Sequence, residues 1–147
     1  MQTVRQQLLS PSMKQVRIDL VAVGSDGPSR NTTDYKLGRI CLARHLGDPG
    51  IASIDVDRRY ARQLLLREPS EFEDTARVPL LLCAECADLG CGALTVHVER
   101  LGALYVWRDF ARAAPYSPEL CASEIAARTG PFSFEAAQYE STFLAYC

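Results

Sequence analysis

Two neighbouring stretches of strand-forming residues, 93–100 and 103–110, constrain the fold of this sequence more than any other feature. Both stretches have strand composition, and Leu101-Gly102 between them fits a two-residue hairpin turn. A loop of this length predicts a register in which Arg100 faces Ala103. Val98 then faces Tyr105, and Val96 faces Trp107. One face of the hairpin is apolar and must be buried in the core; its residues are Leu94, Val96, Val98, Tyr105 and Trp107.

Hydrophobic periodicity predicts further strands and helices around this hairpin. The expected strands lie at residues 16–23, 51–56 and 79–82. The expected helices lie at residues 58–67, at about 118–128 and at about 135–146, and 35–45 fits either structure. Strands and helices do not alternate as regular β-α-β units, so the sequence predicts an α+β fold. We expect a small antiparallel sheet that includes the 93–110 hairpin and packs against two to four helices.

The length and charge of the chain indicate one domain and exclude some classes of partner. At 147 residues the chain is close to the commonest domain size, so we expect a single α+β domain, 1–147, in which residues 1–15 are a loosely ordered arm. The formal net charge of −2 argues against a protein that coats nucleic acid or anionic lipid. The sequence has neither a signal peptide nor an apolar run of roughly 18 residues, so we expect a cytoplasmic protein with no membrane partner.

The six cysteines of the sequence are Cys41, Cys83, Cys86, Cys91, Cys121 and Cys147. In a reducing compartment, cysteines are more often buried, metal-bound or redox-active than paired in disulfides. Three of them fall in the stretch 83–92, which follows the predicted buried strand 79–82 and precedes the hairpin. This stretch is therefore the place in the sequence where chemistry is most expected.

The spacing of these three cysteines predicts a metal site. A Cys-x-x-Cys step, formed by Cys83 and Cys86, lets two thiolates converge on one ion. Gly90 and Gly92 let the backbone bring Cys91 back to the same point. Three soft ligands suit Zn²⁺ or, less often, Cu(I). A closed structural zinc site needs a fourth ligand, for which Asp88 in the same stretch is the best local candidate.

Other candidates for the fourth ligand come from outside the stretch. His97 lies four residues into the predicted strand, which carries it about 13 Å from the strand start at ~3.3 Å per residue. Zinc ligands must lie within about 4 Å of one another, so His97 is a poor candidate. The sequence does not rank His45, Cys41 and Cys121.

Alternative interpretations of the three cysteines stay open. The thiols can simply pack as small apolar groups, or one of them can be a reactive thiolate. A thioredoxin-like site is disfavoured because Gly90 and Gly92 prevent a long helix after Cys86. A zinc deaminase is disfavoured because His97-Val98-Glu99 follows the Cys-x-x-Cys step instead of preceding it. On the outer face of the hairpin, His97, Glu99 and Arg108 fit an ordinary solvated sheet face better than a ligand site.

Three runs of sequence together carry a resemblance: 83–96, then Val106-Trp107-Arg108-Asp109-Phe110, then Gly130-Pro131-Phe132-Ser133-Phe134 with Gln138-Tyr139-Glu140. The pattern resembles a family of small, uncharacterised actinobacterial proteins that share a C-x-x-C-x-D-x-G-C-G loop. It covers roughly residues 79–140, and Ala87 departs from the glycine expected before Asp88. The resemblance implies a shared fold and a shared cysteine loop, and it implies no activity.

The functional hypothesis from the sequence is a small metal-binding accessory or interaction protein. Zinc held by Cys83, Cys86, Cys91 and Asp88 would stabilise the fold, and the partner would be another protein or a second copy of the chain. The alternative is a small metal- or thiol-dependent enzyme that uses the same cysteine loop. A protein-binding module whose thiols only pack is the third hypothesis, so the sequence leaves open whether the chain is an enzyme.

Overall fold

The structure is a computed structural model, and it describes residues 13–23, 32–47, 51–52, 58–70, 77–83, 92–114, 117–121 and 124–147. Within these ranges the fold is α+β, as the sequence predicts. The strands are β1 (Lys14–Gln15), β2 (Ile18–Val23), β3 (Thr32–Leu37), β4 (Ile40–Cys41), β5 (Ile51–Ala52), β6 (Arg77–Cys83), β7 (Ala93–Leu101), β8 (Leu104–Ala114), β9 (Ser117–Cys121) and β10 (Phe132–Glu135). The helices are α2 (Leu42–Leu46), α3 (Arg58–Leu64), α4 (Glu124–Arg128) and α5 (Ala136–Leu144).

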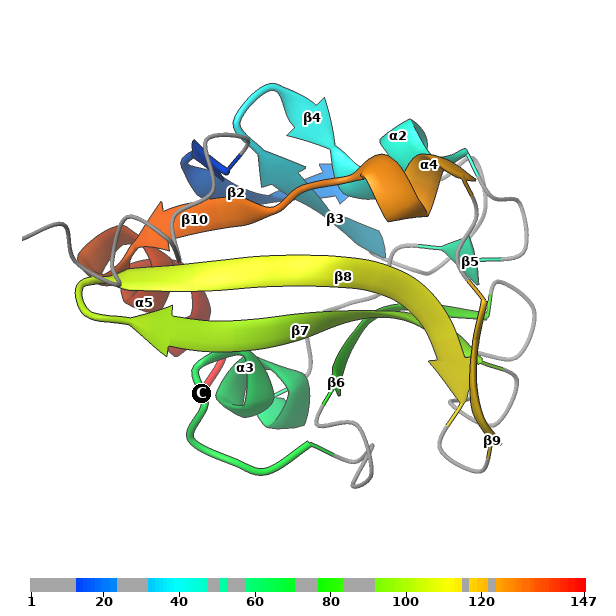
Figure 1. The fold of residues 1–147 in the computed structure, drawn as a ribbon. Coiled ribbons are helices and arrows are strands. Elements are labelled where there is room, and N and C mark those ends of the chain that lie inside the picture. Colours follow the sequence, from blue (N-terminus) through cyan, green and yellow to red (C-terminus); the bar gives the residue numbers. More distant parts are fainter. Residues whose placement is uncertain are drawn as a thin grey trace, which may run out of the picture.

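The described strands form two sheets (Figure 1). The larger sheet has the order β1-β10-β8-β7-β6-β5, with β9 also pairing with β8, and the smaller sheet has the order β2-β3-β4. All pairs are antiparallel except β1 with β10, which is parallel. The larger sheet is therefore mixed instead of purely antiparallel, because Lys14–Gln15, within the expected arm, add a strand to its edge.

The predicted hairpin is present as β7 and β8, but its register differs from the prediction. Leu101 faces Leu104 and Val98 faces Trp107, so the two-residue turn consists of Gly102 and Ala103. Gly102 has a φ of 60°, which a turn with glycine at its first central position requires. Moving the turn by one residue shifts each partner by two, which keeps every side chain on its predicted face. Val96, Val98, Tyr105 and Trp107 are accordingly buried in the core.

A β-bulge interrupts the β7–β8 pairing. Between the pairs His97–Arg108 and Thr95–Ala111, β8 contains one residue more than β7. Asp109 lies within this bulge and has a φ of 58°, a left-handed conformation that is uncommon outside glycine. Beyond the bulge, β8 bends toward the end of the molecule where β9 pairs with it (Figure 1).

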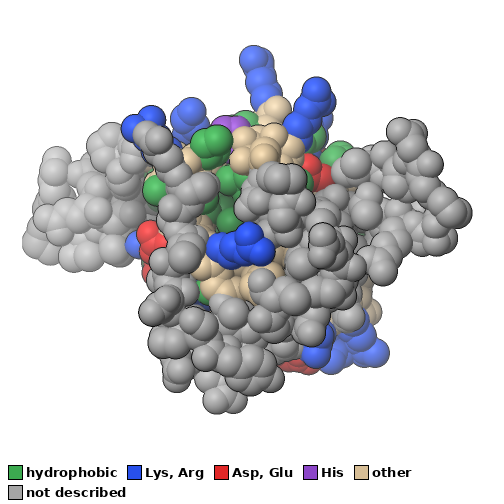
Figure 2. Space-filling view, turned by 90° about the vertical axis from the view of Figure 1, so that its right-hand side faces the viewer, with side chains coloured by type: hydrophobic (Ala, Val, Ile, Leu, Met, Phe, Trp, Pro, Cys, Tyr) green, Lys and Arg blue, Asp and Glu red, His purple; other side chains and the backbone are tan. Residues whose placement is uncertain are grey.

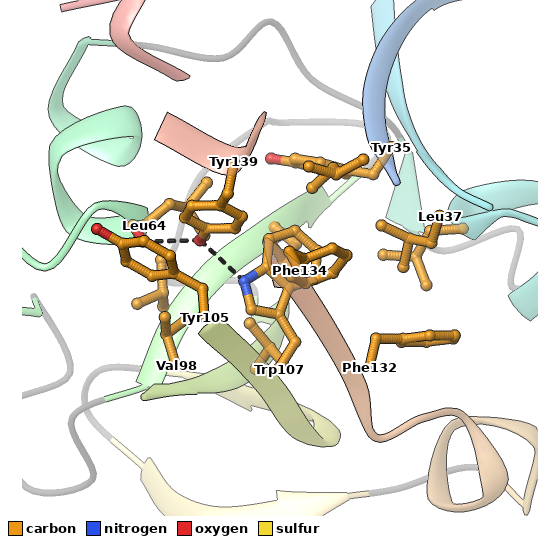
Figure 3. Packing of buried hydrophobic residues seen from close by; sticks show 14 of the residues in the cluster. Tyr35, Leu37, Leu64, Val98, Tyr105, Trp107, Phe132, Phe134 and Tyr139 are labelled. Atoms are coloured by element: carbon orange, nitrogen blue, oxygen red, sulfur yellow. Dashed lines mark hydrogen bonds between the residues drawn. The ribbon is translucent and has the colours of Figure 1, made fainter. Parts of the chain in front are cut away.

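The core is built around Trp107, which is fully buried between the two sheets and α5. Tyr35 and Phe134 approach its ring edge-on, with centroid distances of 5.7 and 5.1 Å. Tyr105 stacks on Tyr139 at 4.1 Å, and the Trp107 indole N–H donates to the Tyr139 hydroxyl at 2.9 Å (Figure 3). Such edge-to-face and stacked pairs add specific geometry to the burial of apolar area.

The remaining elements agree with the predictions in part. Helix α3 buries Tyr60, Ala61 and Leu64, and α5 lies within the expected range 135–146. The prediction of a helix at about 118–128 is wrong for its first half, where β9 pairs with β8. Among the described residues of this range, only α4 is helical. The ambiguous stretch 35–45 contains the end of β3, the turn at Gly38, β4 and most of α2.

Candidate functional site

The cysteine-containing stretch connects β6 to β7. Strand β6 ends at Cys83 and β7 begins at Ala93, as expected for a buried strand that delivers Cys83 to its end. Cys86, Asp88 and Cys91 lie outside the described residues, as does the side chain of Cys83. The structure therefore describes the two ends of the candidate metal site and not its ligand atoms.

The two ends of the stretch lie on adjacent antiparallel strands. Leu81, two residues before Cys83, faces Leu94, two residues after Gly92. Facing Cα atoms of antiparallel neighbours are about 5 Å apart. Gly92 has a φ of 95°, and a Cβ at this position would lie 3.3 Å from Arg112 Nε. A glycine is thus required where the chain enters β7, next to the guanidinium of Arg112.

On the other side of Cys83 lies β5, which follows α2 in the chain. Ile51 is the register partner of Cys83. Helix α2 ends at Leu46, its Gly47 cap has a φ of 61°, and His45 is exposed in its last turn. His45 is thus a helix C-terminal residue beside its glycine cap.

Several of the described basic side chains lie along one side of this end of the molecule. Figure 2 shows the end at which β5 and β9 lie, with Lys and Arg side chains gathered along its top and hydrophobic side chains in the middle. The last turns of α2 and α4, which lie at the top of this end in Figure 1, contribute Arg44, His45 and Arg128.

The order of the larger sheet separates Cys121 from Cys83. Cys121 faces Arg112 on β8, and Arg112 faces Leu94 on β7. Strands β8 and β7 therefore lie between β9 and β6 in the order of the sheet.

The other described cysteines belong to elements other than β6 and β7. Cys41 belongs to β4 of the smaller sheet and is partly buried, and Cys147 is exposed with its Sγ 3.7 Å from the Phe143 carbonyl oxygen. Both are free thiols. Within the described ranges, no group of three His, Cys, Asp or Glu side chains is placed to hold a metal ion.

His97 lies on the outer face of the larger sheet, four residues beyond the start of β7. Its Nδ1 is 3.3 Å from Glu99 Oε1, and Arg108 Nη2 is 3.0 Å from Glu99 Oε2. The sequence interpretation of these three side chains as a sheet face with solvent access agrees with their exposures of about one third. The register adds Arg77 of β6, which faces His97 and is 6% exposed. Sequence reasoning missed Arg77, whose only signal is an arginine directly before an apolar run.

The buried tyrosines are not candidates for acid–base catalysis near neutral pH. Burial, followed by the negative charge of Asp34, raises the pKa of Tyr35 far above its ordinary value. Burial likewise raises the pKa of Tyr139 well above the ordinary value, against the opposing effect of the hydrogen bond from Trp107. Both phenols therefore stay protonated and serve the packing of the core.

Comparison with known proteins adds no further constraint. No known family model, curated protein or solved structure matches the chain. The described helices include none that is both long and apolar enough to cross a membrane. The resemblance of the cysteine loop to an uncharacterised actinobacterial family therefore stays a prediction.

Proposed function

We propose that the chain is a small zinc-binding accessory or interaction protein of the cytoplasm. The stretch that joins β6 to β7 holds the ion through Cys83, Cys86 and Cys91, and Asp88 supplies the fourth ligand. The observation that supports this proposal is the antiparallel pairing of the two flanking strands, β6 and β7. The stretch with the three cysteines leaves one of these strands and returns on its neighbour, so its two ends are close together.

The proposed ion acts on stability. Consecutive Cα atoms are about 3.8 Å apart, so Cys91 stays close to the strand end at Gly92. The binding free energy of the ion would add to the free energy of folding. With four protein ligands the zinc ion has no open coordination position for a substrate. The role of the protein is then to present a stable surface to another protein or to a second copy of itself.

The alternative, a small metal- or thiol-dependent enzyme, has one specific observation in its favour. Arg112 Nε lies beside the backbone of Gly92. A guanidinium next to a cysteine lowers the thiol pKa and makes the thiolate a better nucleophile. The same positive charge also favours thiolate ligands of a metal ion. The reactivity of the thiols, and not the position of Arg112, therefore separates the two functions.

The test is the metal content and thiol reactivity of the purified full-length chain. We expect one equivalent of zinc per chain, slow labelling of three thiols, and fast labelling of the same three after chelation, with a lower melting temperature. Cys91→Ser is expected to lose the zinc, whereas the matched variant Cys147→Ser keeps it, because Cys147 is exposed and remote from β6 in sequence.

Two other outcomes decide against a structural zinc site. A chain without metal, whose melting temperature chelation leaves unchanged, rules it out. One thiol that labels rapidly below pH 7 supports the enzyme alternative instead.

A further inference from the structure

Three side chains that carry N–H donors lie side by side on the outer face of the larger sheet. Arg77 of β6 faces His97 of β7, and His97 faces Arg108 of β8. Register partners project from the same face of a sheet, with their Cα atoms about 5 Å apart. The opposite face at this level carries Val98 and Trp107, which belong to the core. We call Arg77, His97 and Arg108 the cationic row.

Both guanidinium groups of the cationic row have an unused donor. Arg77 Nη2 and Arg108 Nε are buried and have no hydrogen-bond partner. Arg77 Nε donates to Thr95 Oγ1 at 2.7 Å, and the Thr95 hydroxyl itself donates to the Ala111 carbonyl at 2.8 Å. Buried donors of charged groups are costly to leave unpaired, so their presence in two neighbouring side chains indicates a missing acceptor.

The described acidic groups around the row leave these donors unpaired. Glu99 contacts Arg108 through Nη2 and His97 through Nδ1, which leaves Arg108 Nε and His97 Nε2 unengaged. Asp109, exposed in the bulge, acts on Arg77 only through its charge. Burial lowers the pKa of Arg77 and Asp109 partly offsets this effect. Arg77 is thus a desolvated cation without a hydrogen-bonded counter-ion.

We propose that the cationic row binds an oxyanion group, a phosphate or a carboxylate, whose oxygens accept hydrogen bonds from Arg77 and Arg108. Guanidinium groups match such oxygens in geometry and charge. The oxyanion enters over His97 and Arg108, whose side chains are 33% and 31% exposed, and Arg77 contributes from beneath. This site is independent of the cysteine stretch and of the proposed zinc.

The test is a titration of the full chain, followed by amide and histidine ring NMR signals at constant ionic strength. The probes are inorganic phosphate and acetate, with chloride as the reference anion. We expect saturable shifts at residues 77, 97 and 108. A larger response to phosphate than to acetate assigns the site to phosphate esters, and the reverse assigns it to carboxylates.

Variants separate a built site from general attraction between charges. Arg108→Gln is expected to weaken binding roughly tenfold or more, the loss expected for one charge-assisted hydrogen bond. The matched control is Arg17→Gln, which removes the same charge from a 70% exposed side chain of the N-terminal region. If Arg108→Gln does not fold, His97→Ala, at a side chain that is 33% exposed, tests the same row and is expected to weaken binding. Shifts that do not saturate, or equal affinities for Arg108→Gln and Arg17→Gln, overturn the proposal.

Discussion

Two tyrosines of the core have opposite hydrogen-bonding situations. Tyr139 accepts from the Trp107 indole N–H at 2.9 Å and donates to the Leu64 carbonyl at 2.7 Å, which ties α5 to β8 and α3. The hydroxyl of Tyr35 is buried without a partner. Both rings are fully buried. Replacing each tyrosine by phenylalanine in turn therefore measures how much the hydrogen bonds of Tyr139 contribute to stability.

Tyr139→Phe is expected to lower the free energy of unfolding by about 1–3 kcal/mol. The substitution keeps the ring but leaves a buried indole N–H and a buried carbonyl without partners. Urea unfolding followed by tryptophan fluorescence measures the change, since Trp107 is the only tryptophan. A loss below about 0.5 kcal/mol would contradict the predicted role of the two hydrogen bonds.

The matched substitution Tyr35→Phe is the control, and it is expected to leave the stability unchanged or to increase it. It removes a polar atom that the fold buries without compensation. If Tyr35→Phe costs as much as Tyr139→Phe, the hydroxyl of Tyr35 has a partner in solution.

At the level of residues, alternation predicts the core of the hairpin but not the side chains that bridge distant segments. Leu94, Val96, Val98, Tyr105 and Trp107 are buried as expected, because a period of two fixes which side faces inward. Asp34 is a side chain that bridges two segments and that the pattern does not predict. Its Oδ1 accepts from the amides of Tyr35 and Ala43, and so caps the first turn of α2 from β3. That contact depends on the β3–β4 turn, which local pattern does not specify.

The secondary-structure elements are set by their neighbours as well as by their own composition. Residues 118–121 have a composition that fits a helix, yet they form part of β9 because β8 extends beyond β10 and offers a free edge there. In the hairpin, the apolar pattern allows any register shifted by two, and the turn selects one of them. The first central residue of the turn has a positive φ, which glycine adopts more easily than leucine or alanine. The observed turn places Gly102 at this position, whereas the predicted turn would place Leu101 there.

Gly102→Ala is therefore expected to destabilise the fold by about 1 kcal/mol, because an L-residue in the left-handed region is strained. Thermal unfolding by circular dichroism measures the shift. Ala103→Gly, at the other residue of the same turn, is the control and is expected to cost less. Equal costs for the two variants would mean that the turn does not depend on the φ of residue 102.

For the molecule as a whole, the sequence predicts the α+β class and the position of the cysteine stretch between a buried strand and the hairpin. It could not predict the order of the strands, because pairing between distant segments depends on tertiary packing. That order decides which residues come near the candidate site: it separates Cys121 from Cys83 and sets Ile51 beside Cys83. The ligands Cys86, Asp88 and Cys91 lie outside the described residues and stay predictions.

The stability of the whole molecule is expected to fall in alkaline solution. The pKa values of Tyr35 and Tyr139 are raised in the folded state, so between the unfolded value near 10 and the folded values the native state binds more protons. Their contribution is fully present below about pH 10 and is lost as the pH rises through the folded pKa values. Melting temperatures between pH 8 and pH 11.5 measure this loss.

Absorbance near 295 nm gives an independent check, because it counts ionised phenols. Fewer than the six tyrosines of the chain should titrate before the protein unfolds. Ionisation of all six at an ordinary pKa, with the fold intact, would contradict the burial of these two rings.

The position of β7 has a consequence for how the domain fluctuates. From Leu94 to His97 this strand has a hydrogen-bonded neighbour on both sides, so its amide hydrogens exchange with solvent only when most of the sheet opens. Strand β5, in contrast, has two residues and lies at an edge of the sheet, where local detachment costs far less than global unfolding. The backbone of β6 at Cys83, which pairs with β5, is therefore expected to lose its partner in local fluctuations, while β7 keeps both of its neighbours.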